Sequence, residues 1–214
     1  MGFLKGLFGT KAEPPKRQLN HPRQLQVGDM ITLDTDFGLP TQLRGQQFRV
    51  EAVNTYEYSR SQHPEWVLKG YSGDTVFLGL DEDDECSLVF SITITRPEVD
   101  SLFGLDAFGE IFEEEQKAEL QTLAVPERLE QWVGKQYHEV SFAEFGYFHR
   151  QDYRGLKPPQ DANGACGDAF EAYGLEDDSG ERALEVEVYE GGDTEVCVSL
   201  YRPLSDIREY WPGS

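Results

Sequence analysis

The sequence predicts a mainly β (α+β) fold in which two related antiparallel β units, arising from an internal duplication, are joined by a helical segment. The first observation is a repeat: residues 45–58 recur as residues 134–147, and residues 91–100 recur as residues 197–206. The second is a series of short segments in which apolar and polar residues alternate, as expected of half-buried strands. The third is a stretch between the two copies whose apolar residues have helical spacing.

The two parts of the repeat have different offsets, 89 for the first and 106 for the second. In the first part, a Gly-x-Gln-aromatic motif precedes two aromatic residues; in the second, an Arg-Pro pair precedes an aspartate. The larger second offset means that about 17 residues are inserted in the second copy, and the irregular segment 149–168 is where we place them.

The strands expected in the first unit follow a basic amino-terminal arm, residues 1–24, and lie at 25–33, 48–53, 64–71, 74–81 and 86–95. Five consecutive acids at 81–85 separate the last two. They lack the alternate ligands and the glycine of a calcium-binding EF-hand loop, so a solvated hairpin turn is the preferred interpretation.

The segment between the copies is predicted to be helical. Pro97 suits the first turn of a short helix. A longer helix is expected over 107–124, where Phe108, Ile111 and Phe112 share one face, and a second over 126–133. We therefore divide the chain into the arm (1–24), a first β-rich unit (25–106), a helical connector (107–133) and a second β-rich unit (134–214).

The strands expected in the second unit lie at 136–147, 168–175, 182–190 and 194–202, and a helical turn is expected within 203–210. Aromatic residues recur with strand periodicity at equivalent places in both copies, which favours a shared core or sheet face over a surface that stacks on bases or sugars.

The net charge of −21 is extreme for 214 residues. It argues against nucleic acid or an anionic membrane surface as a general partner, because both carry the same sign. The arm has a local balance of +4, so the rest of the chain carries −25. The acidic body is either a solvated coat or a face for a basic protein or metal ions.

The arm also carries apolar residues that could bind a partner. As a helix it would place Phe3, Leu4, Leu7 and Phe8 on one face beside Lys5, suited to a lipid interface or a groove on a protein. The run is too short for a signal peptide or a transmembrane span, and its glycines disfavour an isolated helix, so a frayed tail is the alternative.

Cysteine usage indicates a reducing compartment, and with no targeting segment in view we expect the cytoplasm. The three cysteines are far apart and form no Cys-x-x-Cys pair, which argues against disulfides and against a zinc site. Cys197 lies in an alternating strand pattern and is most simply a small core residue.

The insertion at 149–168 holds the only catalytic candidates, His149, Asp152 and Cys166, all of them weak. A thiolate at Cys166 would need a neighbouring imidazole, and His149 is the candidate base. No recognisable signature surrounds Cys166, and His149 with Asp152 is too small a set to hold a metal. A recognition loop or a solvated loop is preferred, and we expect neither a metal nor a cofactor.

A resemblance to a known family covers most of the chain. The apolar start at residues 2–9, the Leu25-x-Val27-Gly28-Asp29 strand, the block from Phe48 to Trp66 and the Arg-Pro ending at 96–97 resemble the YjfK-like family of uncharacterised bacterial proteins. The resemblance implies a cytosolic bacterial protein whose gene often neighbours one for a protein similar to phage shock protein A. It implies no catalytic residues.

Together these observations favour a non-enzymatic bacterial adaptor or binding protein, linked in this hypothesis to envelope or membrane stress. We expect a protein partner, in this hypothesis a membrane-associated one, with peripheral contact to the inner membrane through residues 1–9. One alternative is an acidic protein that neutralises a toxin or mimics nucleic acid, which needs a basic target and salt-sensitive binding. Another is a thiol or hydrolytic enzyme that uses the 149–168 loop.

Overall fold

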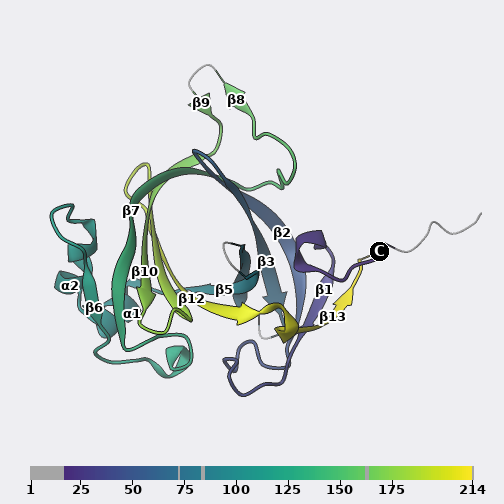
Figure 1. Ribbon diagram of the computed structural model, residues 1–214, viewed down its shortest axis with the longest axis horizontal. Coiled ribbons are helices and arrows are strands. Elements are labelled where there is room, and N and C mark those ends of the chain that lie inside the picture. Colours follow the sequence, from purple (N-terminus) through teal and green to yellow (C-terminus); the bar gives the residue numbers. More distant parts are fainter. Residues whose placement is uncertain (1–16, 72, 83–84, 162–163, 214) are drawn as a thin grey trace, which may run out of the picture.

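The fold is known from a computed structural model, which describes residues 17–71, 73–82, 85–161 and 164–213 (Figure 1). Strands hold 48% of the residues and helices 13%, which confirms the prediction of a mainly β protein. In this part of the chain, eleven strands form one large antiparallel sheet, and β8 (Gln160–Asp161) and β9 (Gly164–Ala165) form a separate small hairpin.

Eight strands of the large sheet close on themselves, because β2 pairs with β7 as well as with its sequence neighbour β3. We call these eight the closed sheet. In order of pairing they are β2 (Gln47–Tyr58), β3 (Gln62–Gly70), β4 (Thr75–Asp81), β5 (Ser87–Thr93), β12 (Thr194–Pro203), β11 (Arg182–Tyr189), β10 (Asp168–Asp177) and β7 (Gln136–His149). Four come from each half of the chain, and the two sets meet at β5–β12 and at β2–β7.

The remaining strands continue the sheet outside this ring. The first residues of β2 pair with β1 (Met30–Leu33), which pairs in turn with β13 (Ile207–Trp211). The first residues of β7 pair with β6 (Glu119–Gln121). Both β2 and β7 therefore change neighbours along their length, and each has a register irregularity before it reaches the other. Such bulges bend a strand and increase its twist, which allows the ring to close.

Alternation along the strands divides the closed sheet into two faces. Trp66, Leu78, Phe90, Leu184 and Val198 belong to the hydrophobic core. This face is covered by the segments that precede β2 and follow β5. Those segments contribute the buried residues Leu25, Leu39, Leu43, Leu102, Phe103, Ile111, Leu129 and Trp132. The other face of the same strands looks into the ring.

The predicted helix at Pro97 is confirmed as α1 (Arg96–Phe103). A capping box between Thr95 and Glu98 stabilises its first turn. The expected helix over 107–124 is wrong. Residues there form α2 (Leu105–Gly109) and the 3-10 turn η2 (Glu110–Phe112), and further on the strand β6. The run of polar residues at 113–117 offers no apolar face for a longer helix to bury.

Two other helical expectations are also corrected. The segment 126–133 holds only the 3-10 turn η3 (Glu127–Leu129). After β12, the turn η4 (Leu204–Asp206) is present as expected, but β13 follows it. After the turn η1 (Pro22–Gln24), the first expected strand begins later than predicted. A turn in which Gly28 has a φ of +92° precedes β1, and the strand starts only at Met30.

Candidate functional site

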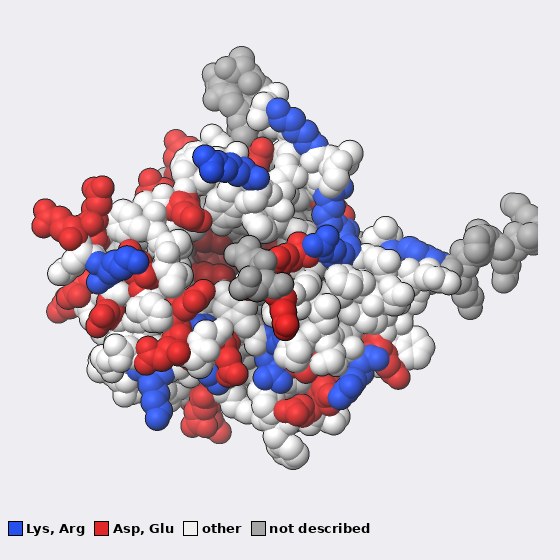
Figure 2. Space-filling view, in the orientation of Figure 1, with Lys and Arg blue, Asp and Glu red and all other residues white. Residues whose placement is uncertain are grey.

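The closed sheet encloses a cavity of about 650 Å³. Its wall includes residues from every strand of the ring: Tyr56 (β2), Glu65 (β3), Phe77 (β4), Ser91 (β5), Cys197 (β12), Glu187 (β11), Tyr173 (β10) and Glu144 (β7). A space lined by all eight strands must lie inside the ring. Figure 2 shows that it opens on this side of the molecule as a central hollow with acidic side chains inside it.

Strand alternation places the acidic side chains in the cavity. On β11, Leu184 is fully buried in the core and does not line the cavity, whereas Glu185 and Glu187 do. On β3, Trp66 is fully buried in the core and its neighbour Glu65 lines the cavity. Glu65, Glu185 and Glu187 are called the acidic triad below. Each keeps partial contact with solvent, which it reaches through the cavity.

Neutral donors hold the acidic triad in place. Asn54 Nδ2 donates a hydrogen bond of 2.8 Å to Glu65 Oε1, and Ser199 Oγ donates one of 3.2 Å to Glu185 Oε2. The hydroxyl of Tyr189 donates to Glu187 Oε2 over 2.5 Å. None of the ion pairs among the described residues includes a member of the triad.

Enclosure changes the acidity of the triad. Burial raises the pKa of Glu65 to about 8; the hydrogen bond from Asn54 opposes this rise, and the charges of Glu187, Glu195 and Glu185 add to it. Burial raises the pKa of Glu187 to about 7, against the hydrogen bonds from the tyrosines. Burial also raises the pKa of Glu185. Part of the triad is therefore protonated at neutral pH.

Aromatic rings pack around Tyr56, which lines the cavity. Tyr56 lies 5.0 Å from the ring of Phe148 and 5.6 Å from that of Phe170, and Phe170 lies 5.8 Å from Tyr189. Gly146 makes this packing possible, because a Cβ there would lie only 2.7 Å from the Phe170 ring. These rings form a packed cluster. Two of the recurring aromatic residues do not share in such packing, because Tyr71 and Phe145 are exposed.

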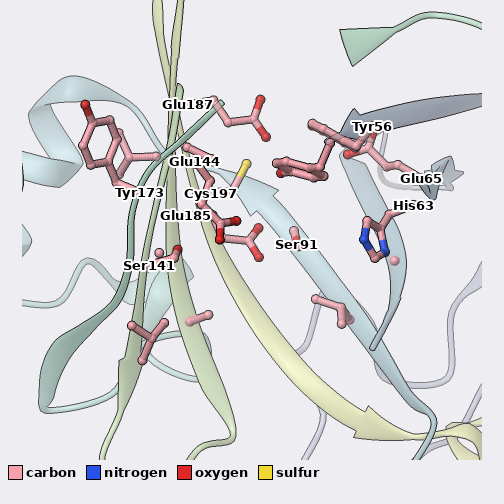
Figure 3. A pocket seen from close by; sticks show the side chains of 18 of the residues that line it. Tyr56, His63, Glu65, Ser91, Ser141, Glu144, Tyr173, Glu185, Glu187 and Cys197 are labelled. Carbon is pink, nitrogen blue, oxygen red and sulfur yellow. The ribbon is translucent and has the colours of Figure 1, made fainter. Parts of the chain in front are cut away.

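Cys197 is on the cavity wall, which corrects the expectation that it is a core residue. Figure 3 shows its sulfur directed into the space between the walls, near Glu185 and Glu187 and across from Glu65. Burial and the nearby carboxylates raise the pKa of this thiol well above its usual range. It is in weak contact with Thr93 Oγ1, at 3.8 Å.

The catalytic candidates in the 149–168 loop are held by different partners. His149 is buried, and its Nε2 lies 2.9 Å from Glu57 Oε2. Asp152 accepts hydrogen bonds from the Arg154 side chain, at 2.8 and 2.6 Å. Cys166 is exposed, and within the described part of the chain no hydrogen bond links its sulfur to His149.

The base of this loop is fastened to β2. Thr55 Oγ1 donates to the carbonyl of Gln151 and accepts from the backbone N–H of Tyr153, at 2.9 and 3.0 Å. The partner-binding candidates Phe3, Leu4, Lys5, Leu7 and Phe8 lie outside the described residues, as does part of the acid run at 81–85.

The described residues offer neither a metal site nor a membrane-spanning helix. No group of three or more His, Cys, Asp or Glu side chains converges so as to hold a metal ion. No helix in this part of the chain combines the length and the apolar character needed to cross a membrane.

Comparison with protein-family models, curated proteins and solved structures found no match. The case for a function therefore depends on the cavity and its lining.

Proposed function

We propose that the protein is a non-enzymatic binding protein that holds a small ligand in the cavity of the closed sheet. The observation that carries this proposal is the enclosure: a space of about 650 Å³ is lined by all eight strands and opens to the surface. Its volume lies within the range of about 300–1,000 Å³ that is usual for small-molecule sites. Its lining combines aromatic rings with a large set of polar and acidic side chains.

The arrangement around Cys197 favours binding over thiol chemistry. A nucleophilic cysteine needs a lowered pKa and a nearby base or positive charge. The pKa of Cys197 is raised instead, by burial and by the neighbouring carboxylates. Ser199 donates its hydrogen bond to a carboxylate and contacts Ser91 Oγ at 2.7 Å, so its hydroxyl is part of the wall.

The proposal extends to the origin of the closed sheet, which we attribute to the duplication seen in the sequence. Where β5 pairs with β12, Ser91 lies opposite Ser199 and Thr93 lies opposite Cys197. The repeat makes Ser91 equivalent to Cys197 and Thr93 equivalent to Ser199, so exchanging the copies exchanges the two pairs. This register supports a twofold relation between the halves.

On this relation, the acids of β11 belong to one half alone. Phe77 lies opposite Ser91, and Glu185 lies opposite Cys197, which makes Phe77 the counterpart of Glu185. The same reasoning from the strand register makes Gly79 the counterpart of Glu187. A difference between two copies of one scaffold is where a specific function is expected, and this difference falls on the cavity wall.

Labelling of Cys197 tests the proposal. In a variant with Cys86→Ser and Cys166→Ser, the small neutral reagent methyl methanethiosulfonate should modify Cys197 in the folded protein, as followed by intact-mass spectrometry. Gly79 lines the cavity, and a Cβ there would make only an ordinary contact with Val89, at 3.6 Å. Gly79→Phe should therefore fill the space and slow labelling at least ~10-fold, whereas Gly79→Ala should not.

Three five-carbon probes then test for binding: pentane-1,5-diamine, glutarate and pentane-1,5-diol. At least one should protect Cys197 from the reagent at millimolar concentration, and the protection should be absent in Gly79→Phe. The proposal fails if Cys197 is modified only as fast as the protein unfolds globally. It also fails if none of the three probes protects.

A further inference from the structure

We propose that the ligand of this cavity is a small organic cation, a protonated amine or short diamine, held between the acidic triad and the aromatic wall. This inference rests on the proposed binding function and adds the chemical class of the ligand. It is carried by the charges that face the cavity, by the shape of the site and by its aromatic lining.

The charges that face the cavity are strongly unequal. Among the described residues that line it, the acidic side chains are those of Glu65, Glu144, Glu176, Glu185 and Glu187, and the basic ones are those of Arg60 and His63. His63 Nε2 lies 2.9 Å from Ser61 Oγ, on the turn between β2 and β3. The side-chain hydrogen bonds to the triad come from neutral donors.

Enclosed carboxylates without a counter-charge are unfavourable, because the surroundings solvate a charge poorly and like charges repel. The protein tolerates them in part by keeping protons on them. A cation that enters the cavity would supply the missing charge in a setting where Coulomb attraction is less screened than in water. A deep, partly desolvated acidic cavity thus favours cations over neutral or anionic molecules of the same size.

The shape of the site distinguishes an organic cation from a metal ion. A metal ion needs several ligand atoms converging on one point at about 2–2.5 Å. No such group is found among the described residues, and Figure 3 shows the triad spread over opposing walls, with Glu65 facing Glu185 and Glu187. Carboxylates spread in this way suit a molecule with extent, such as a diamine that places one ammonium near each wall.

The aromatic wall supports the same class. Tyr56, Tyr58, Phe77 and Tyr173 line the cavity beside the acids. Aromatic faces attract ammonium groups, and they also cover the methylene chain of an aliphatic amine. A hydrated metal ion would gain little from such rings.

Binding of a cation in the cavity should depend on pH. The groups that face Glu65 are Asn54, Glu185, Glu187 and Glu195, and those that face Glu187 are Tyr56, Tyr189, Glu185 and Glu195. The other titratable residues in the described lining are Tyr58, Arg60, His63, Glu144, Tyr173, Glu176, Cys197 and Tyr201. Without ligand, Glu65 is mostly protonated at neutral pH and Glu187 is protonated in part, since their pKa values are raised to about 8 and about 7. A cation favours the ionised carboxylates, so its binding should release protons and tighten as pH rises from 6 to 8.

The test uses the single-cysteine protein (Cys86→Ser, Cys166→Ser) and the same three five-carbon probes. Pentane-1,5-diamine should protect Cys197, whereas glutarate and pentane-1,5-diol should not. The diamine concentration that halves the labelling rate should fall at least ~10-fold between pH 6 and pH 8, after the labelling rate without probe at each pH is divided out.

Matched variants locate the effect. Glu65→Gln and Glu187→Gln keep the side-chain shape and remove the charge, so each should raise the half-protecting concentration at least ~10-fold at pH 8. Glu190→Gln is the control, because Glu190 is an exposed acid just after β11, the strand of Glu187, and is not among the cavity-lining residues. Circular dichroism and urea unfolding would confirm that the variants are folded.

Each outcome is decisive. If glutarate or the diol protects Cys197 and the diamine does not, the binding function stands and the cation inference is wrong. If magnesium chloride protects at a lower concentration than the diamine, the organic class is wrong. If the glutamine variants at 65 and 187 bind the diamine as the Glu190→Gln control does, the acidic triad is not the site. If no probe protects, the proposed function itself fails.

Discussion

Replacing Glu65 by glutamine should make the protein more stable at high pH and leave its stability almost unchanged at pH 5. The folded-state pKa of Glu65 is about 8, well above the value of about 4.5 expected in the unfolded chain. Between these two values the folded protein holds a proton that the unfolded chain has released. Stability must therefore fall as pH rises through this window, and the loss is complete above the folded-state pKa.

The size of the effect follows from the shift. A shift of about 3.5 pKa units corresponds to roughly 5 kcal/mol of unfolding free energy lost between pH 4 and pH 9. Glutamine has no charge to bury, and its side-chain oxygen can still accept the hydrogen bond from Asn54. The variant should lack this component of the pH dependence while keeping the packing of the wall.

Urea unfolding at unit steps from pH 5 to pH 9 measures this difference. The free energy of unfolding of Glu65→Gln minus that of the parent should be below about 1 kcal/mol at pH 5 and should grow to roughly 5 kcal/mol at pH 9. Subtraction removes the general repulsion of a chain with a net charge of −21. A difference that stays constant within about 1 kcal/mol over this range would refute the claim that Glu65 is enclosed without a counter-charge.

Two further predictions concern other parts of the chain. The Arg128 guanidinium, helped by Thr95, lowers the pKa of Glu98 to about 2. This carboxylate therefore stabilises the fold above pH 4.5, and the contribution is lost as pH falls toward 2. In urea unfolding, Glu98→Gln should cost about 1–2 kcal/mol at pH 7, after allowance for the exposure of Arg128, and much less at pH 2.5. An equal cost at both pH values would contradict this assignment. Deleting residues 1–9 should abolish flotation with anionic lipid vesicles if the arm docks on a membrane, and unchanged flotation would end that hypothesis.

The strands were the most predictable part of the fold, because the two faces of the closed sheet differ in polarity. Alternation predicted all eight strands of the closed sheet, and most of the predicted strand ends lie within a few residues of the observed ones. The short strands β6 and β13 escaped prediction, since three to five residues carry little periodicity. The helix expected over 107–124 failed for a related reason. Apolar residues have helical spacing over only about two turns, and the residues that follow them have no apolar face that a longer helix would bury.

Closure of the ring could not be read from local pattern. The pairing of β2 with β7 joins Thr55 to His149 and Tyr58 to Gly146, residues about 90 positions apart. Such contacts are set by the bend of each strand and by packing between rings such as Tyr56 and Phe170. The buried state of His149 has the same origin. In the sequence it is a histidine at the start of a long loop, and only the ring brings Glu57 to it.

The acidic triad was missed because alternation indicates that a strand has one apolar and one polar face. It does not indicate whether the polar face is exposed to bulk water or encloses a cavity. Leu184, Glu185, Val186 and Glu187 form a pattern typical of a surface strand with its glutamates in water. Once the sheet closes, the same polar face encloses a cavity, and Glu65 from another strand faces it. The sequence offsets gave no such signal, because Phe77 becomes the counterpart of Glu185 only through the strand register and the proposed twofold relation. A charge that replaces an apolar residue at an equivalent strand position is costly wherever that face is enclosed, and a ligand of opposite charge would offset that cost.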